Sequence, residues 1–333
     1  MKKLFIVLGI ITIFMIIAFS WFLLSLFSEP DLGKAPEYYP FKSVTAKEQY
    51  LIYYDTRARD WPVASESIIV ETPSGETFVR ISGPQNSQPL VLLPSTSASS
   101  LIWMPNIKAL SEQFRVYAID NIYDFGRSKN SLNIKSSDDM MNWLDELFTA
   151  LDLEDDINLM GLSFGGWLTS QYTLNYPHRL NKAVWLAPAA TLFEFPGEWA
   201  WRGILSCLPH RYFMEKFMIE WLFEDLIKRN DETSLKQIDE LVEDAMMGLK
   251  CFKFRMPVTP SILSDNELQR ITVPTLFLVG ENEKLYPAEQ AVERLENEAP
   301  QIQTEIIPDA GHDLTIVQSE LVNRRILEFL MKD

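Results

Sequence analysis

The sequence predicts an α/β fold in which helices cover both faces of a mostly parallel sheet. Short apolar segments alternate with segments of helical periodicity, and strands that are apolar throughout are typical of a parallel sheet buried on both faces. The alternation stops at residues 188–260, where we expect a helical insertion, and then resumes. One strand-to-helix transition carries a Gly-x-Ser-x-Gly pattern, which is the most informative stretch of the chain.

Length and composition restrict the class of protein. The 333 residues suffice for one α/β domain with an insertion or for two small domains, and 47% hydrophobic and 12% aromatic residues argue against disorder. A net charge of −16 offers no basic stripe to phosphates, so we expect no nucleic-acid partner. Cys207 and Cys251 could form one disulfide in an oxidising compartment, but we favour two buried thiols. We expect neither a metal nor a cofactor.

The first residues predict a membrane anchor. Residues 4–27 form an almost uninterrupted apolar run, which as a helix would span about 36 Å and cross a hydrocarbon core of about 30 Å. Because no clear A-x-A cleavage site follows, we favour an uncleaved single-pass anchor in the cell membrane over a removed signal peptide. Lys2 and Lys3 precede the run, and Glu29 and Asp31 follow it, so we expect the bulk of the chain outside the cytoplasm.

A linker, one helix and a hairpin are expected before the parallel strands. Residues 28–41 contain three prolines and no periodicity, which is typical of a linker, and residues 45–57 have helical spacing. Two strands, at residues 67–71 and 77–81, flank the turn residues 73–75 and predict a hairpin.

The parallel part of the sheet is expected from residue 90 onward. Its strands are short apolar runs, and its helices place apolar residues on one face, as in the segment that we expect Ser137 to cap. We expect the strands at residues 90–93, 114–119, 157–162, 182–186, 273–280 and 304–308. We expect the helices at residues 105–113, 137–151, 164–176, 287–298 and 314–332.

The insertion at residues 188–260 is interpreted as a lid packed over the edge of the sheet. It contains Trp199, Trp201 and Trp221, together with many other apolar residues at helical spacing. We interpret most of these aromatic residues as packing rather than as substrate contacts, because aromatic side chains dominate protein cores generally.

The Gly-x-Ser-x-Gly pattern, residues 161–165, predicts a nucleophile elbow. It lies between a predicted strand and a predicted helix, so that Ser163 stands at the tip of a very sharp turn. A Cβ atom at Gly161 or Gly165 would clash with neighbouring backbone in such a turn. Ser163 itself is expected in a strained backbone conformation, which is tolerated mainly at functional sites.

A serine nucleophile requires a base, and the chain has three histidines. His178 lies at the end of the helix that follows the elbow, and His210 lies within the insertion. His312 follows the last predicted strand and precedes the last helix. In a parallel sheet that loop emerges at the same edge as the elbow, so the sequence predicts His312 as the base.

An acid that orients the histidine is expected in the loop after the strand at residues 273–280. The candidates are Glu281, Glu283 and, at a greater distance, Glu289. Glu283 is far enough from the strand to turn back over its end, and we choose it with Glu281 as the alternative. Asp309 and Asp313 are too close in sequence to His312 to reach its ring from the opposite side.

Two backbone amides are needed to stabilise the oxyanion of a tetrahedral intermediate. One is expected from Phe164, which follows the nucleophile. The other should come from the loop at residues 94–100, where Thr96 N–H is our candidate.

From about Ser67 to its end, the chain resembles the α/β-hydrolase fold family, in the esterase-like branch that has a helical cap. The matching features are residues 90–93 with Ser99-Ser100, Trp103 and Pro105 after them, residues 116–120 with Gly126-Arg127-Ser128, residues 161–166, residues 274–280, and Gly311-His312. The order Ser163, Glu283, His312 is also the order of that family. The chain departs from the family pattern at Pro94-Ser95, where His-Gly is usual, and at Tyr123, where glycine is usual.

The resemblance implies a serine hydrolase, most simply one that cleaves a carboxylic ester through an acyl-enzyme on Ser163. A serine nucleophile argues against the dehalogenase and epoxide-hydrolase branches, which use aspartate. The apolar lid suggests a hydrophobic acyl or alcohol part in the substrate. An amidase or peptidase, a carbon–carbon bond hydrolase, and a non-catalytic lipid- or protein-binding member of the fold are the alternatives. The expected organisation is an anchor at residues 1–28, a linker and helix at 29–66, a hydrolase core at 67–187 and 261–333, and a lid at 188–260.

Overall fold

The structure is a computed structural model that describes residues 31–208, 210–253, 255 and 258–332. The predicted anchor at residues 4–27 lies outside these described residues. Within them, no helix has the length and apolar character needed to cross a membrane.

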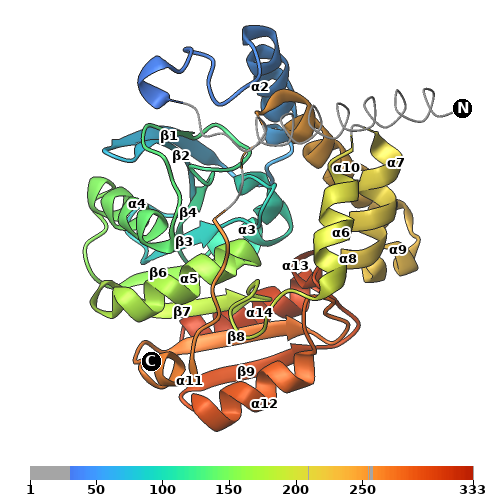
Figure 1. Ribbon diagram of the computed structural model, residues 1–333. Coiled ribbons are helices and arrows are strands. Elements are labelled where there is room, and N and C mark those ends of the chain that lie inside the picture. The colour runs from blue at the N-terminus through green and yellow to red at the C-terminus, as the bar shows by residue number, and fades with distance from the viewer. Residues whose placement is uncertain (1–30, 209, 254, 256–257, 333) are drawn as a thin grey trace, which may run out of the picture.

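A mixed sheet forms the centre of the molecule (Figure 1). The described residues contribute nine strands in the order β1-β2-β4-β3-β6-β7-β8-β9, with β5 paired to β2. β2 is antiparallel to β1, β4 and β5, and the other pairings are parallel, which confirms the mostly parallel sheet. The strands are β1 Ser65–Thr72, β2 Gly75–Ser82, β3 Pro89–Leu93, β4 Arg115–Ile119, β5 Lys129–Asn130, β6 Ile157–Leu162, β7 Leu180–Leu186, β8 Thr275–Gly280 and β9 Ile302–Ile307.

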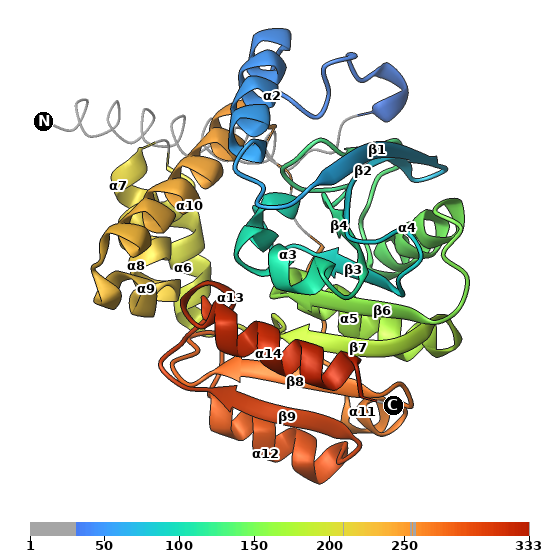
Figure 2. The same ribbon diagram turned by 180° about the vertical axis from the view of Figure 1, so that it is seen from behind.

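Helices cover both faces of the sheet, as the continuous apolar strands predict. Within β3, Val91 and Leu93 belong to the core with α4, α5 and α12, while Leu90 and Leu92 belong to the core with α3 and α14. Figure 1 shows the first set of helices in front of the sheet, and Figure 2 shows α3 and α14 on the opposite face. These helices are α3 Met104–Ser111, α4 Ser137–Ala150, α5 Phe164–Asn175, α12 Ala288–Glu298 and α14 Ser319–Leu330.

Helix termini account for two corrections. Ser136, not Ser137, caps α4: its hydroxyl accepts a hydrogen bond from Asp139 N–H, and the Asp139 carboxylate accepts one from the Ser136 backbone N–H. The last predicted helix, at 314–332, is two helices, α13 Leu314–Val317 and α14, which are separated at Gln318.

Two short elements, β5 and α11 Asp265–Gln269, were not predicted, because segments of two and five residues carry little periodicity.

The segment between β7 and β8 is helical, as expected of the insertion. The insertion contains α6 Gly197–Ser206, α7 Arg211–Met214, the π-helix η4 Glu215–Ile219, α8 Glu220–Leu222, α9 Glu224–Arg229 and α10 Glu232–Cys251. Figures 1 and 2 show helices α6 to α10 of this segment together at one end of the sheet, beside α13.

The remaining described helices lie outside the insertion. They are η1 Leu32–Lys34, α2 Val44–Ala58, η2 Ser100–Trp103 and η3 Pro177–Arg179.

The two cysteines do not pair. Cys207 and Cys251 are both free thiols; Cys251 is buried, but Cys207 is exposed at the end of α6, so the prediction of two buried thiols is wrong for Cys207.

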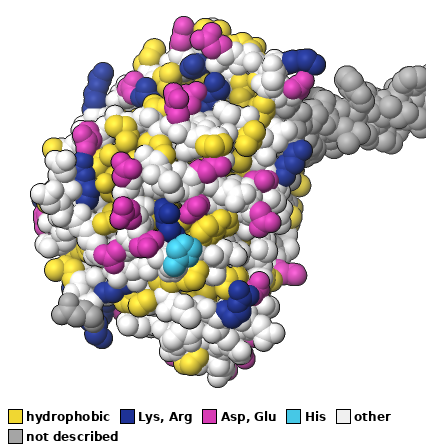
Figure 3. Space-filling view, turned by 90° about the vertical axis from the view of Figure 1, so that its left-hand side faces the viewer, with side chains coloured by type: hydrophobic (Ala, Val, Ile, Leu, Met, Phe, Trp, Pro, Cys, Tyr) yellow, Lys and Arg dark blue, Asp and Glu magenta, His cyan; other side chains and the backbone are white. Residues whose placement is uncertain are grey.

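On the face drawn in Figure 3, acidic and basic side chains are interspersed among apolar ones.

Candidate active site

Ser163 occupies a sharp turn between β6 and α5. Its backbone angles are φ 56° and ψ −112°, a conformation that L-residues rarely adopt, and this confirms the predicted strain. A Cβ atom on Gly161 would lie 2.0 Å from Gly165 O, and one on Gly165 would lie 2.2 Å from Leu93 O. Both glycines are therefore required by close backbone approach, as the pattern predicts.

Backbone hydrogen bonds hold the turn against the end of β7. Ser163 N–H donates to Leu186 O at 2.9 Å, and Ser163 O accepts from Trp167 N–H at 2.9 Å and from Ala189 N–H at 3.0 Å. The serine is 8% exposed. The strained residue is thus fixed from three sides at the carboxyl end of β6.

The structure brings His312 and Glu283 together. His312 Nδ1 lies 2.9 Å from Glu283 Oε2, and both residues are buried. The second carboxylate oxygen, Glu283 Oε1, accepts from the backbone N–H groups of Lys284 at 2.8 Å and Leu285 at 2.9 Å. Both oxygens of the carboxylate therefore have partners, which fixes its orientation toward the imidazole.

The electrostatic surroundings favour the protonated form of His312. Burial alone lowers its pKa, but the charge and hydrogen bond of Glu283, together with the charge of Asp313, outweigh burial and raise the pKa above its usual value. In the neutral ring, a proton on Nδ1 donates to Glu283 and leaves the lone pair on Nε2. That is the tautomer a general base needs.

The other glutamates and histidines considered as triad members make different contacts. Glu281 and Glu289 are exposed, and the Glu281 carboxylate accepts from Asp309 N–H at 3.2 Å rather than from a histidine. His178 lies in η3, and His210 is an exposed residue whose Nδ1 caps α7 by accepting from Tyr212 N–H. Among the three glutamates considered, Glu283 is the one that contacts a histidine.

The loop that carries Thr96 is anchored by a half-buried acid, Asp124, that the sequence analysis did not identify. Ser97 N–H donates to Asp124 Oδ2 at 2.9 Å, and Phe125 N–H donates to Asp124 Oδ1 at 2.8 Å. Burial raises the pKa of Asp124 to about 6, although both hydrogen bonds oppose this. Its position just beyond β4, next to β3 in the sheet, is the signal that could have identified it.

The two amides predicted for the oxyanion hole belong to residues that follow two paired strands, β3 and β6. Phe164 is the first residue of α5, a position whose N–H has no partner within the helix. Thr96 is half-buried in the loop after β3, the strand that pairs with β6. The role of the Thr96 amide stays a prediction.

A metal centre is not indicated by the side chains. Within the described part of the chain, no group of three or more His, Cys, Asp or Glu residues is arranged to hold a metal ion.

Comparisons with known proteins identify chains to which this one is similar. The family model described as serine aminopeptidase S33 matches residues 106–317. Carboxylesterase YbfK of Bacillus subtilis (strain 168) is 33% identical over 297 residues, which cover 87% of this chain and 96% of that protein. The crystal structure of naproxen esterase (carboxylesterase NP) from Bacillus subtilis has a TM-score of 0.78 and 30% identity, and covers 86% of this chain and 99% of its own.

Proposed function

The chain belongs to the carboxylesterase family within the α/β-hydrolase superfamily, and from this premise we propose that Ser163, His312 and Glu283 are its catalytic triad. The observation that carries the proposal is the 2.9 Å hydrogen bond between His312 Nδ1 and Glu283 Oε2. Ser163, Glu283 and His312 follow the parallel strands β6, β8 and β9, whose carboxyl ends lie at one edge of the sheet. Acid, base and nucleophile are therefore expected around one point of that edge.

The proposed reaction has two halves. His312 Nε2 takes the hydroxyl proton of Ser163, and Oγ attacks the ester carbonyl carbon to form a tetrahedral oxyanion, stabilised by the N–H groups of Phe164 and Thr96. The intermediate collapses with cleavage of the carbon–oxygen bond, and the alcohol leaves with the proton that His312 returns. A water molecule then attacks the acyl-enzyme with His312 again as base, which releases the carboxylic acid and restores Ser163.

A hydrophobic acyl or alcohol group is the substrate feature that the insertion supports. Phe195 stacks on Trp199 with ring centroids 4.9 Å apart, and Trp199 lies 6.3 Å from Trp221. These rings belong to or pack against the core that contains Phe164, the residue after the nucleophile. These rings are packing contacts, and the support they give is that apolar side chains of the insertion lie against the core beside the nucleophile, which favours apolar ester substituents over charged ones.

Labelling and a matched substrate panel test the function. The full chain, purified in detergent, is expected to react with a fluorophosphonate probe and to hydrolyse p-nitrophenyl esters faster than the p-nitroanilides of the same acids. Esters have the better leaving group, and the curated relatives named above are carboxylesterases. Faster anilide hydrolysis would support the amidase alternative, which the description of the family model also suggests. An unlabelled, folded protein would contradict a serine hydrolase altogether.

The activity is expected to fall in acid because His312 must be neutral to act as the base. Its pKa is raised, so protonation begins at a higher pH than for an ordinary histidine. We expect kcat/KM to increase tenfold per pH unit on the acid limb and to level off above a midpoint higher than about 6.5. The measurement is kcat/KM between pH 5 and 9 on a neutral ester. A flat profile, or a midpoint near that of a free carboxylate, would contradict the role of His312.

A further inference from the structure

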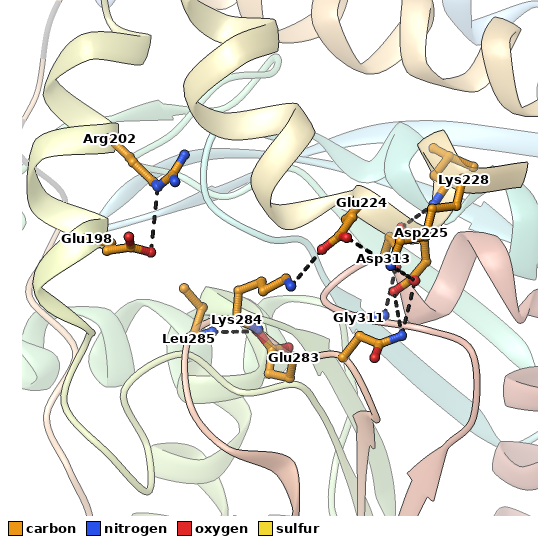
Figure 4. Close-up of polar contacts among 12 residues, drawn as sticks. Glu198, Arg202, Glu224, Asp225, Lys228, Glu283, Lys284, Leu285, Gly311 and Asp313 are labelled. Atoms are coloured by element: carbon orange, nitrogen blue, oxygen red, sulfur yellow. Dashed lines mark hydrogen bonds and ion pairs between the residues drawn. The ribbon is translucent and has the colours of Figure 1, made fainter. Parts of the chain in front are cut away.

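Three consecutive residues at the start of α9 contact the loops that carry the proposed acid and base (Figure 4). The Glu224 carboxylate lies 2.6 Å from Lys284 Nζ. Both carboxylate oxygens of Asp225 accept from Asn282 Nδ2 at 3.1 Å. Leu226 N–H donates to Asp313 Oδ2 at 3.0 Å. We call these three interactions the α9 contacts.

The partners of the α9 contacts flank the triad in sequence. Asn282 and Lys284 are the residues on either side of Glu283, and Asp313 directly follows His312. Asp313 also closes its own loop, because Oδ1 accepts from Gly311 N–H at 3.1 Å. A short helix of the insertion therefore holds the acid loop and the base loop together.

The buried members of the α9 contacts matter more than the exposed ion pair. Glu224 and Lys284 are both partly exposed, and pairs of this kind contribute little. Asp225 is 8% exposed and Asp313 is 1% exposed, so a lost partner there would leave a buried polar group unsatisfied. A Cβ atom on Gly311 would lie 3.3 Å from Asp225 Oδ2, which shows how tightly α9 packs on the base loop.

We propose that Asp225 is a positioning residue for the triad, which sets the position of Glu283 through Asn282 while the adjacent Leu226 amide holds Asp313 and the loop of His312. The insertion then takes part in catalysis by aligning acid and base, besides any role in covering the substrate. This inference rests on the proposed triad. It explains why a buried carboxylate faces the neutral amide of Asn282. Among the described residues, Lys228 is the one cationic side chain within ion-pair distance of Asp225, with its Nζ 3.4 Å away.

Two substitutions at Asp225 separate positioning from charge. Asp225→Ala removes the acceptor for Asn282, and we expect kcat to fall about 10- to 100-fold with KM little changed, because small displacements of catalytic groups cost that much. Asp225→Asn removes the charge but keeps one acceptor oxygen for Asn282, and it should retain most of the activity. Rates are divided by the number of active sites counted from the fluorophosphonate burst, so that unfolded molecules do not contribute.

Glu198→Ala is the matched control. Glu198 is an acid of the same insertion, and its ion pair with Arg202 at 3.8 Å lies within α6, apart from the α9 contacts (Figure 4). We expect it to leave kcat and KM unchanged. If Asp225→Ala gives no folded protein, Asn282→Ala removes the same hydrogen bonds from the other side and should show the same loss of kcat.

The pH profile distinguishes positioning from stability. Glu283 and Asp313 are the charged groups that raise the pKa of His312. If Asp225→Ala loosens the Glu283–His312 hydrogen bond, the pKa of His312 should fall and the acid limb of the kcat/KM profile should move to lower pH. A purely structural role of Asp225 would reduce the amount of active enzyme and leave the acid limb at the same pH.

Three outcomes would overturn the proposal: an unshifted limb, an Asp225→Ala variant with wild-type kcat, or an Asp225→Asn variant as impaired as Asp225→Ala. The proposed function fails separately, if His312→Ala remains active.

Discussion

Replacing Ser163 with alanine is expected to abolish ester hydrolysis, with kcat reduced by a factor on the order of 10⁴ or more. The variant loses the atom that forms the acyl-enzyme, while its methyl group occupies the same position in the turn. The strained backbone is held by the hydrogen bond that Ser163 N–H donates to Leu186 O and by those that Ser163 O accepts from Trp167 N–H and Ala189 N–H, none of which involves the hydroxyl. The melting temperature should therefore stay close to that of the wild type, and the fluorophosphonate probe should no longer label the protein.

Ser170→Ala is the control for this experiment. Ser170 is a fully buried serine of α5, the helix that follows Ser163, and its hydroxyl donates to Trp167 O at 2.8 Å. Its loss removes a buried hydroxyl of similar surroundings without touching the elbow, and we expect full labelling and turnover. A Ser163→Ala variant that still turns over esters at the wild-type rate would place the nucleophile elsewhere.

The parts of the site that depend on position along parallel strands could be predicted from sequence. The pattern at the end of β6 identifies Ser163, and the position after β9 identifies His312. Both positions are informative because the loops that follow parallel strands emerge at the same edge of the sheet. Glu283 required a further judgement of reach, since Glu281 lies in the same loop. The structure separates these two glutamates by exposure and by partner.

The supporting contacts could not be predicted, because they join segments that are distant in sequence. Asp225 and Asn282 are 57 positions apart, and α9 has six residues, too few for a periodic signal. The sequence analysis considered Asp313 only as a triad acid and excluded it on reach, whereas its carboxylate holds Leu226 and Gly311. Ser136 and Ser137 are equally able to cap a helix, so only the position of Asp139 in the folded chain decides between them.

Replacing Glu283 with glutamine is expected to reduce kcat by about 10⁴-fold, because it forces the wrong tautomer on His312. In the wild type, Oε1 accepts from the N–H groups of Lys284 and Leu285, and Oε2 accepts from His312. Glutamine has one acceptor oxygen, and the two backbone donors hold it. The side-chain NH₂ then faces Nδ1, which must accept, so that the ring proton moves to Nε2 and the base can no longer take the proton of Ser163.

Glu281→Gln is the matched control and tests the alternative acid in the same loop. Glu281 is exposed, and its carboxylate accepts from Asp309 N–H, a bond that the glutamine oxygen can also accept. We expect wild-type kcat/KM for this variant. Loss of the Glu283 carboxylate should also lower the pKa of His312, so the residual activity of Glu283→Gln should extend to lower pH. A Glu281→Gln variant that is inactive, beside an active Glu283→Gln variant, would transfer the role of the acid to Glu281.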